Sequence, residues 1–176
     1  MMDITIGTEV TLTEERQELS RQVALKRYGN NRRHGTVQAE IHNMGDGAAE
    51  LEGCAGEIAF CQLFSTEPDL SIYTRSAENG TDTNDTTLPC GLTVDIKTTK
   101  HMNGRLITPI HKNITGDLFA LMTGKFPNYI FKGFMSQEKL IDDSNIGNLG
   151  YGPTYMANQD ELRDLKDIRN TGETIS

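Results

Sequence analysis

The stretch LPCGLTVDIKTTKH, residues 88–101, alternates like a strand that covers a core with one of its faces. Successive side chains of a strand point to opposite sides. The apolar face would consist of Leu92, Val94 and Ile96. Asp95 and Lys97 would stand together on the other face. Such a pair is common as a simple surface ion pair, which contributes little to stability. The other acidic residues of the chain decide whether it has a further role.

Length and composition describe an ordinary soluble chain. With 176 residues it can bury a hydrophobic core without disulfides or a structural metal. We expect one domain over 1–176 with a frayed tail from about 170. No apolar run approaches about 18 residues, and no signal peptide is visible, so we expect no membrane contact and a cytoplasmic location. The net charge of −8 argues against a general nucleic-acid coating protein, but not against a nuclease with acidic metal ligands.

Two helices are predicted before this strand. Residues 11–33 begin with a cap at Thr11 or Thr13, and Gly29 and Asn30 predict the end of that helix. Residues 48–64, AAELEGCAGEIAFCQLF, predict a second helix that is apolar nearly all round and therefore buried on most sides. Glu57 falls within its apolar surface. Gly53 and Gly56 of the same helix would allow another element to approach closely.

Strands and short helices dominate the rest of the chain. Strands are predicted at residues 70–74, 105–110, 117–124 and 128–136. The last two would be joined by a turn around residues 125–128, and Pro109 weakens the second. Short helices are predicted at 136–141, capped by Ser136, and at 160–168. This order predicts an α/β or α+β protein, with a sheet flanked by helices.

The three cysteines, Cys54, Cys61 and Cys90, match no zinc-ligand spacing and no disulfide framework. We expect all three to be reduced, buried thiols.

Two further carboxylates accompany Asp95. Asp85 lies ten residues upstream in a turn-rich segment, and Glu57 lies on the apolar helix, where an unpaired carboxylate is costly. Carboxylates that converge repel one another, and a divalent cation such as Mg²⁺, which prefers oxygen ligands, reverses that repulsion. An adjacent lysine such as Lys97 can orient water or neutralise charge on a phosphoryl group.

The order of Glu57, Asp85 and the triplet Asp95-Ile96-Lys97 resembles the PD-(D/E)XK nuclease superfamily, whose members have a restriction-endonuclease-like fold. The resemblance rests on GCAGEIAFCQLF, residues 53–64, and NDTTLPCGLTVDIKTTK, residues 84–100. Three more segments are similar to small phage-encoded members: RYGNNRRHG (27–35), DLFALMTGKFPNYIFKGFMS (117–136) and NLGYGPTYMANQDEL (148–162).

The resemblance implies a mixed central β-sheet flanked by α-helices and a Mg²⁺-dependent deoxyribonuclease, in which Mn²⁺ can substitute. Asp85, Asp95 and the main-chain carbonyl of Ile96 would bind the metal, and Glu57 would bind it directly or through water. Lys97 would position the attacking water. DNA would be the partner and cleavage would be endonucleolytic, for which a homodimer is a plausible arrangement.

One motif departs from the family pattern. The first aspartate normally follows a proline, whereas Asn84 precedes Asp85 here. Asp82 is therefore an alternative ligand, although the spacing from Asp85 to Asp95 suits a tight hairpin with its bend at Pro89 and Gly91 better.

Phosphate contacts are predicted for residues outside this set. The basic residues Arg27, Arg32 and Arg33 either supply charge at a helix C-terminus or contact phosphate. Thr99 and His101 follow Lys97 and could contact the nucleic-acid backbone.

Two alternatives to a nuclease remain open. One is a non-catalytic DNA- or protein-binding module on the same fold, such as a phage accessory or counter-defence protein. In the other, the VDIK strand, residues 94–97, is an ordinary edge strand and Glu57 is merely paired with a basic side chain.

Overall fold

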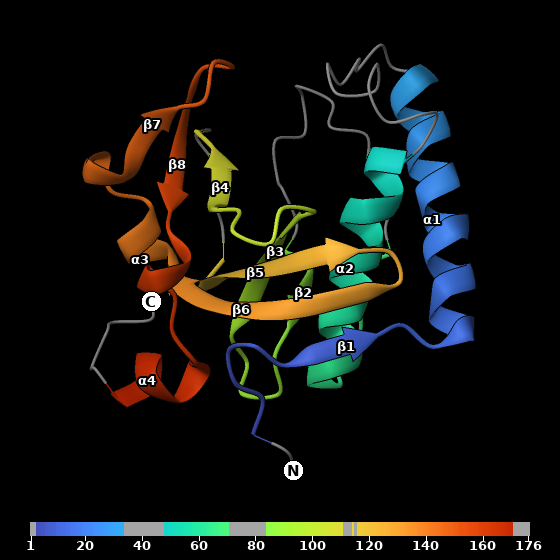
Figure 1. The fold of residues 1–176 in the computed structure, drawn as a ribbon, viewed down its shortest axis with the longest axis horizontal. Helices are drawn as coiled ribbons and strands as arrows, with labels where there is room; N and C mark the ends of the chain where they lie inside the picture. Colours follow the sequence, from blue (N-terminus) through green and yellow to red (C-terminus); the bar gives the residue numbers. More distant parts are fainter. Residues whose placement is uncertain (1–2, 34–47, 71–83, 111–113, 115, 171–176) are drawn as a thin grey trace.

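The protein is described by a computed structural model that covers residues 3–33, 48–70, 84–110, 114 and 116–170. It is a mixed α/β structure with two sheets (Figure 1). The larger sheet has five strands in the order β1-β6-β5-β3-β2. Its strands are β1 (Glu9–Thr11), β2 (Thr86–Thr87), β3 (Thr93–Thr99), β5 (Leu118–Lys125) and β6 (Asn128–Ser136). The predicted strand in residues 88–101 is therefore confirmed as β3.

Strand β5 forms the centre of the larger sheet. It pairs in parallel with β3, so that Asp95 lies beside Phe119 and Lys97 beside Leu121. It pairs antiparallel with β6 in the predicted hairpin. Every residue of β5 except Lys125 is buried, because both faces of this sheet are covered.

Helices α1 (Glu14–Arg33) and α2 (Ala48–Phe64) lie on one side of the sheet (Figure 1). Helix α2 has the predicted bounds, and it buries Cys54, Ala55 and Ile58 in the larger core. That core includes Val94 and Ile96 of β3, as the alternation of the strand predicts. The helix thus covers the apolar face of β3.

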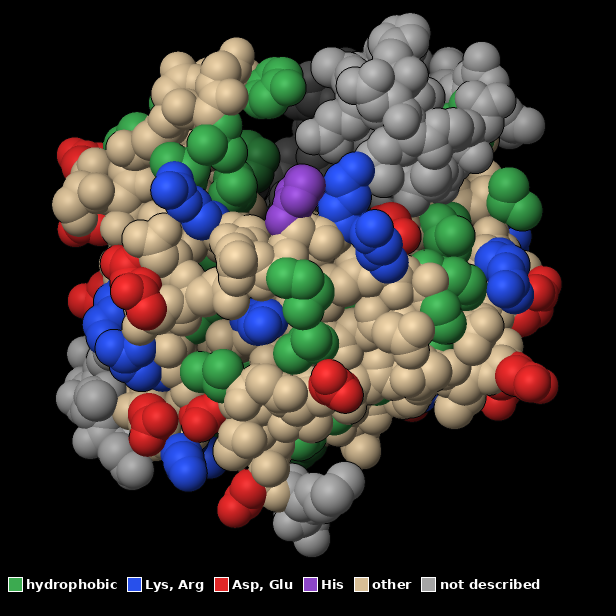
Figure 2. Space-filling model, in the orientation of Figure 1, with side chains coloured by type: hydrophobic (Ala, Val, Ile, Leu, Met, Phe, Trp, Pro, Cys, Tyr) green, Lys and Arg blue, Asp and Glu red, His purple; other side chains and the backbone are tan. Residues whose placement is uncertain are grey.

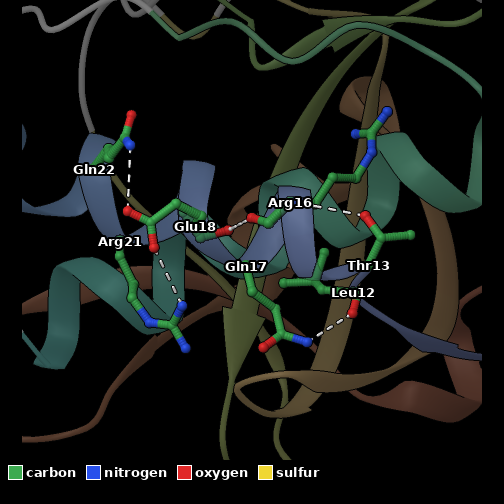
Figure 3. A network of polar contacts seen from close by, with 8 residues as sticks. Leu12, Thr13, Arg16, Gln17, Glu18, Arg21 and Gln22 are labelled. Carbon is green, nitrogen blue, oxygen red and sulfur yellow. Dashed lines mark hydrogen bonds and ion pairs between the residues drawn. The ribbon is translucent and has the colours of Figure 1, made fainter.

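Helix α1 differs from its prediction at the C-terminal end. Figure 3 shows its first turns, where the Thr13 hydroxyl accepts a hydrogen bond from the Arg16 amide at 3.3 Å, which makes Thr13 the cap. The expected stop at Gly29 and Asn30 is wrong, since the helix continues to Arg33. A helical glycine costs only about 1 kcal/mol, and packing of this helix against α2 outweighs that cost.

A second, smaller sheet contains β4 (Leu106–Pro109), β7 (Ile146–Asn148) and β8 (Pro153–Ala157) in the order β4-β8-β7. All its pairings are antiparallel. The strand predicted at 105–110 is thus present but belongs to this sheet and not to the central one. Its Pro109 is tolerated because β4 lies at the edge.

The C-terminal helices are shorter than expected. Helix α3 (Gln137–Leu140) is capped by Ser136 as predicted. The helix predicted over 160–168 is instead a 3-10 turn, η3 (Gln159–Glu161), followed by α4 (Leu165–Asn170). The two are separated because the backbone of Arg163 exchanges hydrogen bonds with Phe134 of β6. A further 3-10 turn, η2, spans Asp143–Asn145.

The two faces of β5 contact different cores. Leu118, Ala120 and Met122 join the larger core beneath α2, whereas Phe119 and Leu121 join a smaller core with the second sheet. Four aromatic rings pack together in the larger core: Phe60, Phe64, Phe131 and Phe134.

The cysteines are all free, but only Cys54 and Cys61 are buried. The expectation of a third buried thiol is wrong, because Cys90 is exposed in the turn between β2 and β3. The predicted strand at 70–74 falls mostly outside the described residues, as does the tail from 171. Within the described part of the chain, no helix has the length and apolar character needed to cross a lipid bilayer.

Candidate functional site

The β2–β3 hairpin places Asp85 against the edge of β3. The hairpin closes through a turn in which the Leu88 amide donates to the Leu92 carbonyl at 2.8 Å. Strand β2 has only two residues, and beyond it the Asp85 carboxylate accepts a hydrogen bond from the Ile96 amide at 2.7 Å. The side chain thereby takes the place of a strand neighbour. This agrees with the tight hairpin expected for Asp85, whereas Asp82 lies outside the described residues.

Asp95 and Lys97 form an ion pair on β3. Lys97 Nζ lies 2.7 Å from Asp95 Oδ1, and the side chains are 25% and 19% exposed. The contact lacks hydrogen-bond geometry, so that Asp95 Oδ1 is a buried oxygen without a hydrogen-bond partner among the described residues. Its negative charge is balanced by the ammonium of Lys97.

Glu57 is held by an arginine from the neighbouring helix. Arg27 Nη1 lies 3.0 Å from Glu57 Oε2, and Arg27 Nη2 donates to the Asp69 carbonyl at 3.1 Å. Both side chains of the ion pair are partly buried. Arg27, for which phosphate contact was one of two predicted roles, therefore joins α1 to Glu57 of α2. This is the pairing that the edge-strand alternative predicts for Glu57, but the edge position that it predicts for the strand is wrong, because β3 lies between β5 and β2.

A close helix–strand contact fixes where Glu57 lies along β3. Gly56 is buried, and a Cβ atom at this position would come within 2.8 Å of Thr98 Cβ and closer still to the ends of that side chain. Only a residue without a side chain fits there. The close approach predicted for Gly56 is confirmed, while Gly53 has no described atom within 4 Å of its Cβ position.

The charged groups of α2 and the hairpin act on each other's pKa values. Burial, first of all, raises the pKa of Asp85 well above its ordinary range, and repulsion from Glu57 and Asp95 raises it further. The Ile96 amide and Lys97 oppose this shift. Burial also raises the pKa of Glu57, against the opposing effect of Arg27. The fold therefore brings Glu57, Asp85 and Asp95, which we name the acidic cluster, within electrostatic reach of Lys97.

The acidic cluster offers the right donor atoms for a hard cation, but not a closed ligand set. No three described His, Cys, Asp or Glu side chains converge closely enough to hold a metal ion. Asp85 is engaged by the Ile96 amide and Glu57 by Arg27. Asp95 Oδ1 is engaged by Lys97 Nζ at 2.7 Å, so a cation would have to bind beside this ammonium or displace it. Carboxylate oxygens of this kind suit Mg²⁺ and Mn²⁺.

The remaining predicted nucleic-acid contacts lie at the end of β3 and of α1. Thr99 is partly buried, and its hydroxyl accepts a hydrogen bond from the amide of the exposed His101 at 3.2 Å. Both follow Lys97 toward the loop between β3 and β4. Arg32 and Arg33 form the last turn of α1, and their side chains are outside the described part of the structure.

One supporting residue has no counterpart in the sequence prediction. Asp117 precedes β5, and its Oδ2 accepts hydrogen bonds from both the amide and the hydroxyl of Thr93, at 2.9 and 3.0 Å. These bonds anchor the first residue of β3 and so help to fix the position of Asp95. A short polar residue directly before a strand was the only available signal.

Comparison with other proteins identifies a family without assigning an activity. Neither the curated proteins nor the solved structures include a match to this chain. Residues 2–143 match a family described as a family of unknown function, DUF5843, and since these residues are more than half of the 176, the chain belongs to that family.

Proposed function

We propose that this protein is a Mg²⁺-dependent endonuclease of the PD-(D/E)XK type, which hydrolyses DNA phosphodiester bonds. One observation carries the proposal: Glu57 from α2, Asp85 from the start of the hairpin, and Asp95 with Lys97 from β3 form a single electrostatic cluster. Burial and mutual repulsion raise carboxylate pKa values there, which is a feature of functional sites. The mixed α/β architecture is compatible with the restriction-endonuclease-like fold but is a coarser likeness.

The proposed roles follow from the donor atoms. Asp85, Asp95 and the Ile96 carbonyl would hold the cation, with Glu57 as a direct or water-mediated ligand. When bound, Mg²⁺ supplies charge stabilisation at the phosphoryl oxygens and lowers the pKa of water. Lys97, a compact cation 2.7 Å from Asp95, is positioned to donate a hydrogen bond to the attacking water or to a phosphoryl oxygen.

Arg27 acts on this site through Glu57. Its charge lowers the pKa of Glu57, which burial would otherwise raise further, so it favours the ionised carboxylate. The guanidinium also fixes the orientation of Glu57 through the 3.0 Å contact. Arg27 is therefore a positioning residue in this proposal.

A non-catalytic DNA- or protein-binding module is the second candidate. It is favoured by the ion pair that already occupies Glu57 and by the lack of three converging ligands among the described residues. Such a module would bind its partner without requiring Mg²⁺.

Cleavage of supercoiled plasmid DNA tests the two candidates. The purified protein should cut with Mg²⁺ or Mn²⁺ and should be inactive in EDTA. Asp95→Asn and Lys97→Ala should each lower the rate by at least about 100-fold. Lys166→Ala is the matched control, because Lys166 ends a second Asp-x-Lys triplet, residues 164–166, yet is exposed on α4.

The outcomes separate the candidates clearly. Cleavage that survives both site variants refutes the proposed site. DNA binding without cleavage, and without a Mg²⁺-dependent rise in melting temperature, supports the binding module.

A further inference from the structure

We propose that the tip of the β7–β8 hairpin stacks Tyr151 on a nucleobase, so that the substrates are nucleic acids with unpaired or unstacked bases near the cleavage site. This inference rests on the proposed function and adds a substrate class to it. The inference is based on the exposure of the tip, the hydrogen bonds of its turn, the charge around it, and its connection to the loop that follows β3.

The tip of the β7–β8 hairpin exposes large apolar side chains to solvent. Tyr151 is 89% exposed, the highest value among the exposed large hydrophobic residues, and Leu149 beside it is 50% exposed. An exposed aromatic ring is a stacking platform for any base, since every base has a π-face. Ile146, at the base of the same hairpin, is 42% exposed and extends this surface.

The turn that carries Tyr151 is held by its own hydrogen bonds. Asn148 Oδ1 accepts from the amides of Gly150 and Gly152, at 2.7 and 3.3 Å. Both glycines have positive φ angles, +99° and +105°, which other residues rarely adopt. Tyr151 is thus presented by a defined turn, and binding a base would require little ordering of the backbone.

The charge distribution favours an anionic partner at this place. The chain has a net charge of −8, yet residues 98–110 contain Lys100 and Arg105 and no acidic residue. Residues 144–159, which include β7, β8 and the tip, contain no charged residue. The small sheet and the β3–β4 loop therefore form a region that phosphates can approach without meeting carboxylates on its strands.

The small sheet is tied to the end of β3. Gln159 Nε2 donates to the carbonyls of Met102 and Gly104 in the β3–β4 loop, at 2.7 and 2.9 Å. Strand β4 continues from this loop and pairs with β8, with Pro109 opposite Thr154. Figure 1 shows the hairpin tip and the β3–β4 loop on one side of the molecule. The C-terminal end of α1 and the N-terminal end of α2 lie on that side too.

Basic side chains gather between these parts of the molecule. Figure 2 shows Lys, Arg and His side chains on the surface between the small sheet and the helices α1 and α2. A nucleic-acid strand that runs along this side could thus place its phosphates near these basic side chains and stack one of its bases on Tyr151. A protein partner could also cover Tyr151, but it would leave the basic side chains between the small sheet and the helices without a role.

Binding measurements without metal test this inference apart from cleavage. The chain contains no tryptophan, so Tyr151→Trp places a single fluorescent reporter at the tip. In EDTA, an oligo(dT) of about 20 nucleotides should quench that reporter strongly, as stacking predicts. Leu25→Trp is the matched control, because Leu25 is 70% exposed on α1 and its reporter should not be quenched.

Fluorescence anisotropy with labelled oligo(dT) gives the affinity. Tyr151→Ala should weaken binding about 10-fold, and Tyr151→Phe, which keeps the ring, should bind like wild type. A fully paired duplex of the same length should bind with little dependence on Tyr151.

Three results would overturn the inference. They are unquenched Tyr151→Trp in the presence of bound oligo(dT), unchanged affinity of Tyr151→Ala, and a lack of binding to any oligonucleotide. A Tyr151-dependent dimer would assign the tip to a second copy of the chain instead. If Mg²⁺-dependent cleavage is observed with any of these results, the nuclease stands and only the stacking role fails.

Discussion

Replacing Gly56 with alanine should destabilise the protein even though alanine is the better helix former. The new Cβ atom would lie 2.6 Å from Thr98 Cγ2 and 2.8 Å from Thr98 Cβ, distances that real Cβ atoms essentially never show. Rotation of the Thr98 side chain cannot relieve the second contact, because Thr98 Cβ is fixed to the backbone of β3. Either α2 or β3 must therefore move.

The net effect follows from two opposing contributions. Overpacking of a buried contact costs about 1–3 kcal/mol. The change from glycine to alanine in a helix interior contributes about 1 kcal/mol in favour of folding. The difference is a decrease of up to about 2 kcal/mol in the free energy of unfolding of Gly56→Ala. Gly53→Ala, on the same helix with no described atom within 4 Å, should raise it by about 0.5–1 kcal/mol.

Urea denaturation followed by far-UV circular dichroism measures both variants against wild type. Thr98→Ala removes the hydroxyl and methyl groups nearest to position 56, so the cost of Gly56→Ala should become smaller in that background. The reasoning is refuted if Gly56→Ala is as stable as Gly53→Ala. It is also refuted if Thr98→Ala leaves the cost of Gly56→Ala unchanged.

Three other predictions concern the charged and thiol groups. Because the pKa of Asp85 is raised in the folded state, its stabilising contribution is present below its ordinary value of 3.8 and is lost as the pH rises through the folded-state pKa. Asp85→Asn should therefore have a higher melting temperature than wild type at pH 8 and a flatter pH profile, and equal profiles would contradict this. Arg27→Ala should lower the free energy of unfolding at pH 7 by about 1–3 kcal/mol, because Glu57 loses its partner, and Glu57→Gln should restore most of the loss in urea titrations. Burial raises the pKa of Cys54 to about 12, whereas Cys90 is exposed, so Ellman's reagent should titrate one thiol rapidly in the native protein and all three in urea; two rapid thiols would show that the larger core is open.

Local patterns in the sequence predicted much of the larger sheet and its helices. The bounds of α2 were predictable because residues 48–64 are apolar on most sides and end at a turn. The β2–β3 and β5–β6 hairpins were predictable because alternation and turn residues act over a few positions. The stop at Gly29 and the long helix over 160–168 were wrong for one shared reason. In both places the observed end of the helix depends on contacts with an element that is distant in the sequence. That element is α2 for the end of α1, and it is Phe134 of β6 for residues 160–168.

The candidate site shows the same division. Asp85, Asp95 and Lys97 lie on one hairpin, so their proximity could be predicted from spacing. The Arg27–Glu57 ion pair could not, because the two residues are 30 positions apart on different helices and nothing local sets the register between those helices. The presence of two sheets was equally hidden, since the sequence of β4 does not reveal that its partner is β8.

The small sheet has a consequence for shortened forms of the protein. Its edge strand β4 comes before β5, whereas its partner β8 comes after β6. A chain truncated after residue 143, where the family match ends, would retain all five strands of the larger sheet. It would leave β4 without a strand to pair with. Leu106, which is fully buried opposite Ala157, would then face water. The C-terminal segment is therefore part of the folding unit, and removing it should leave an aggregation-prone edge.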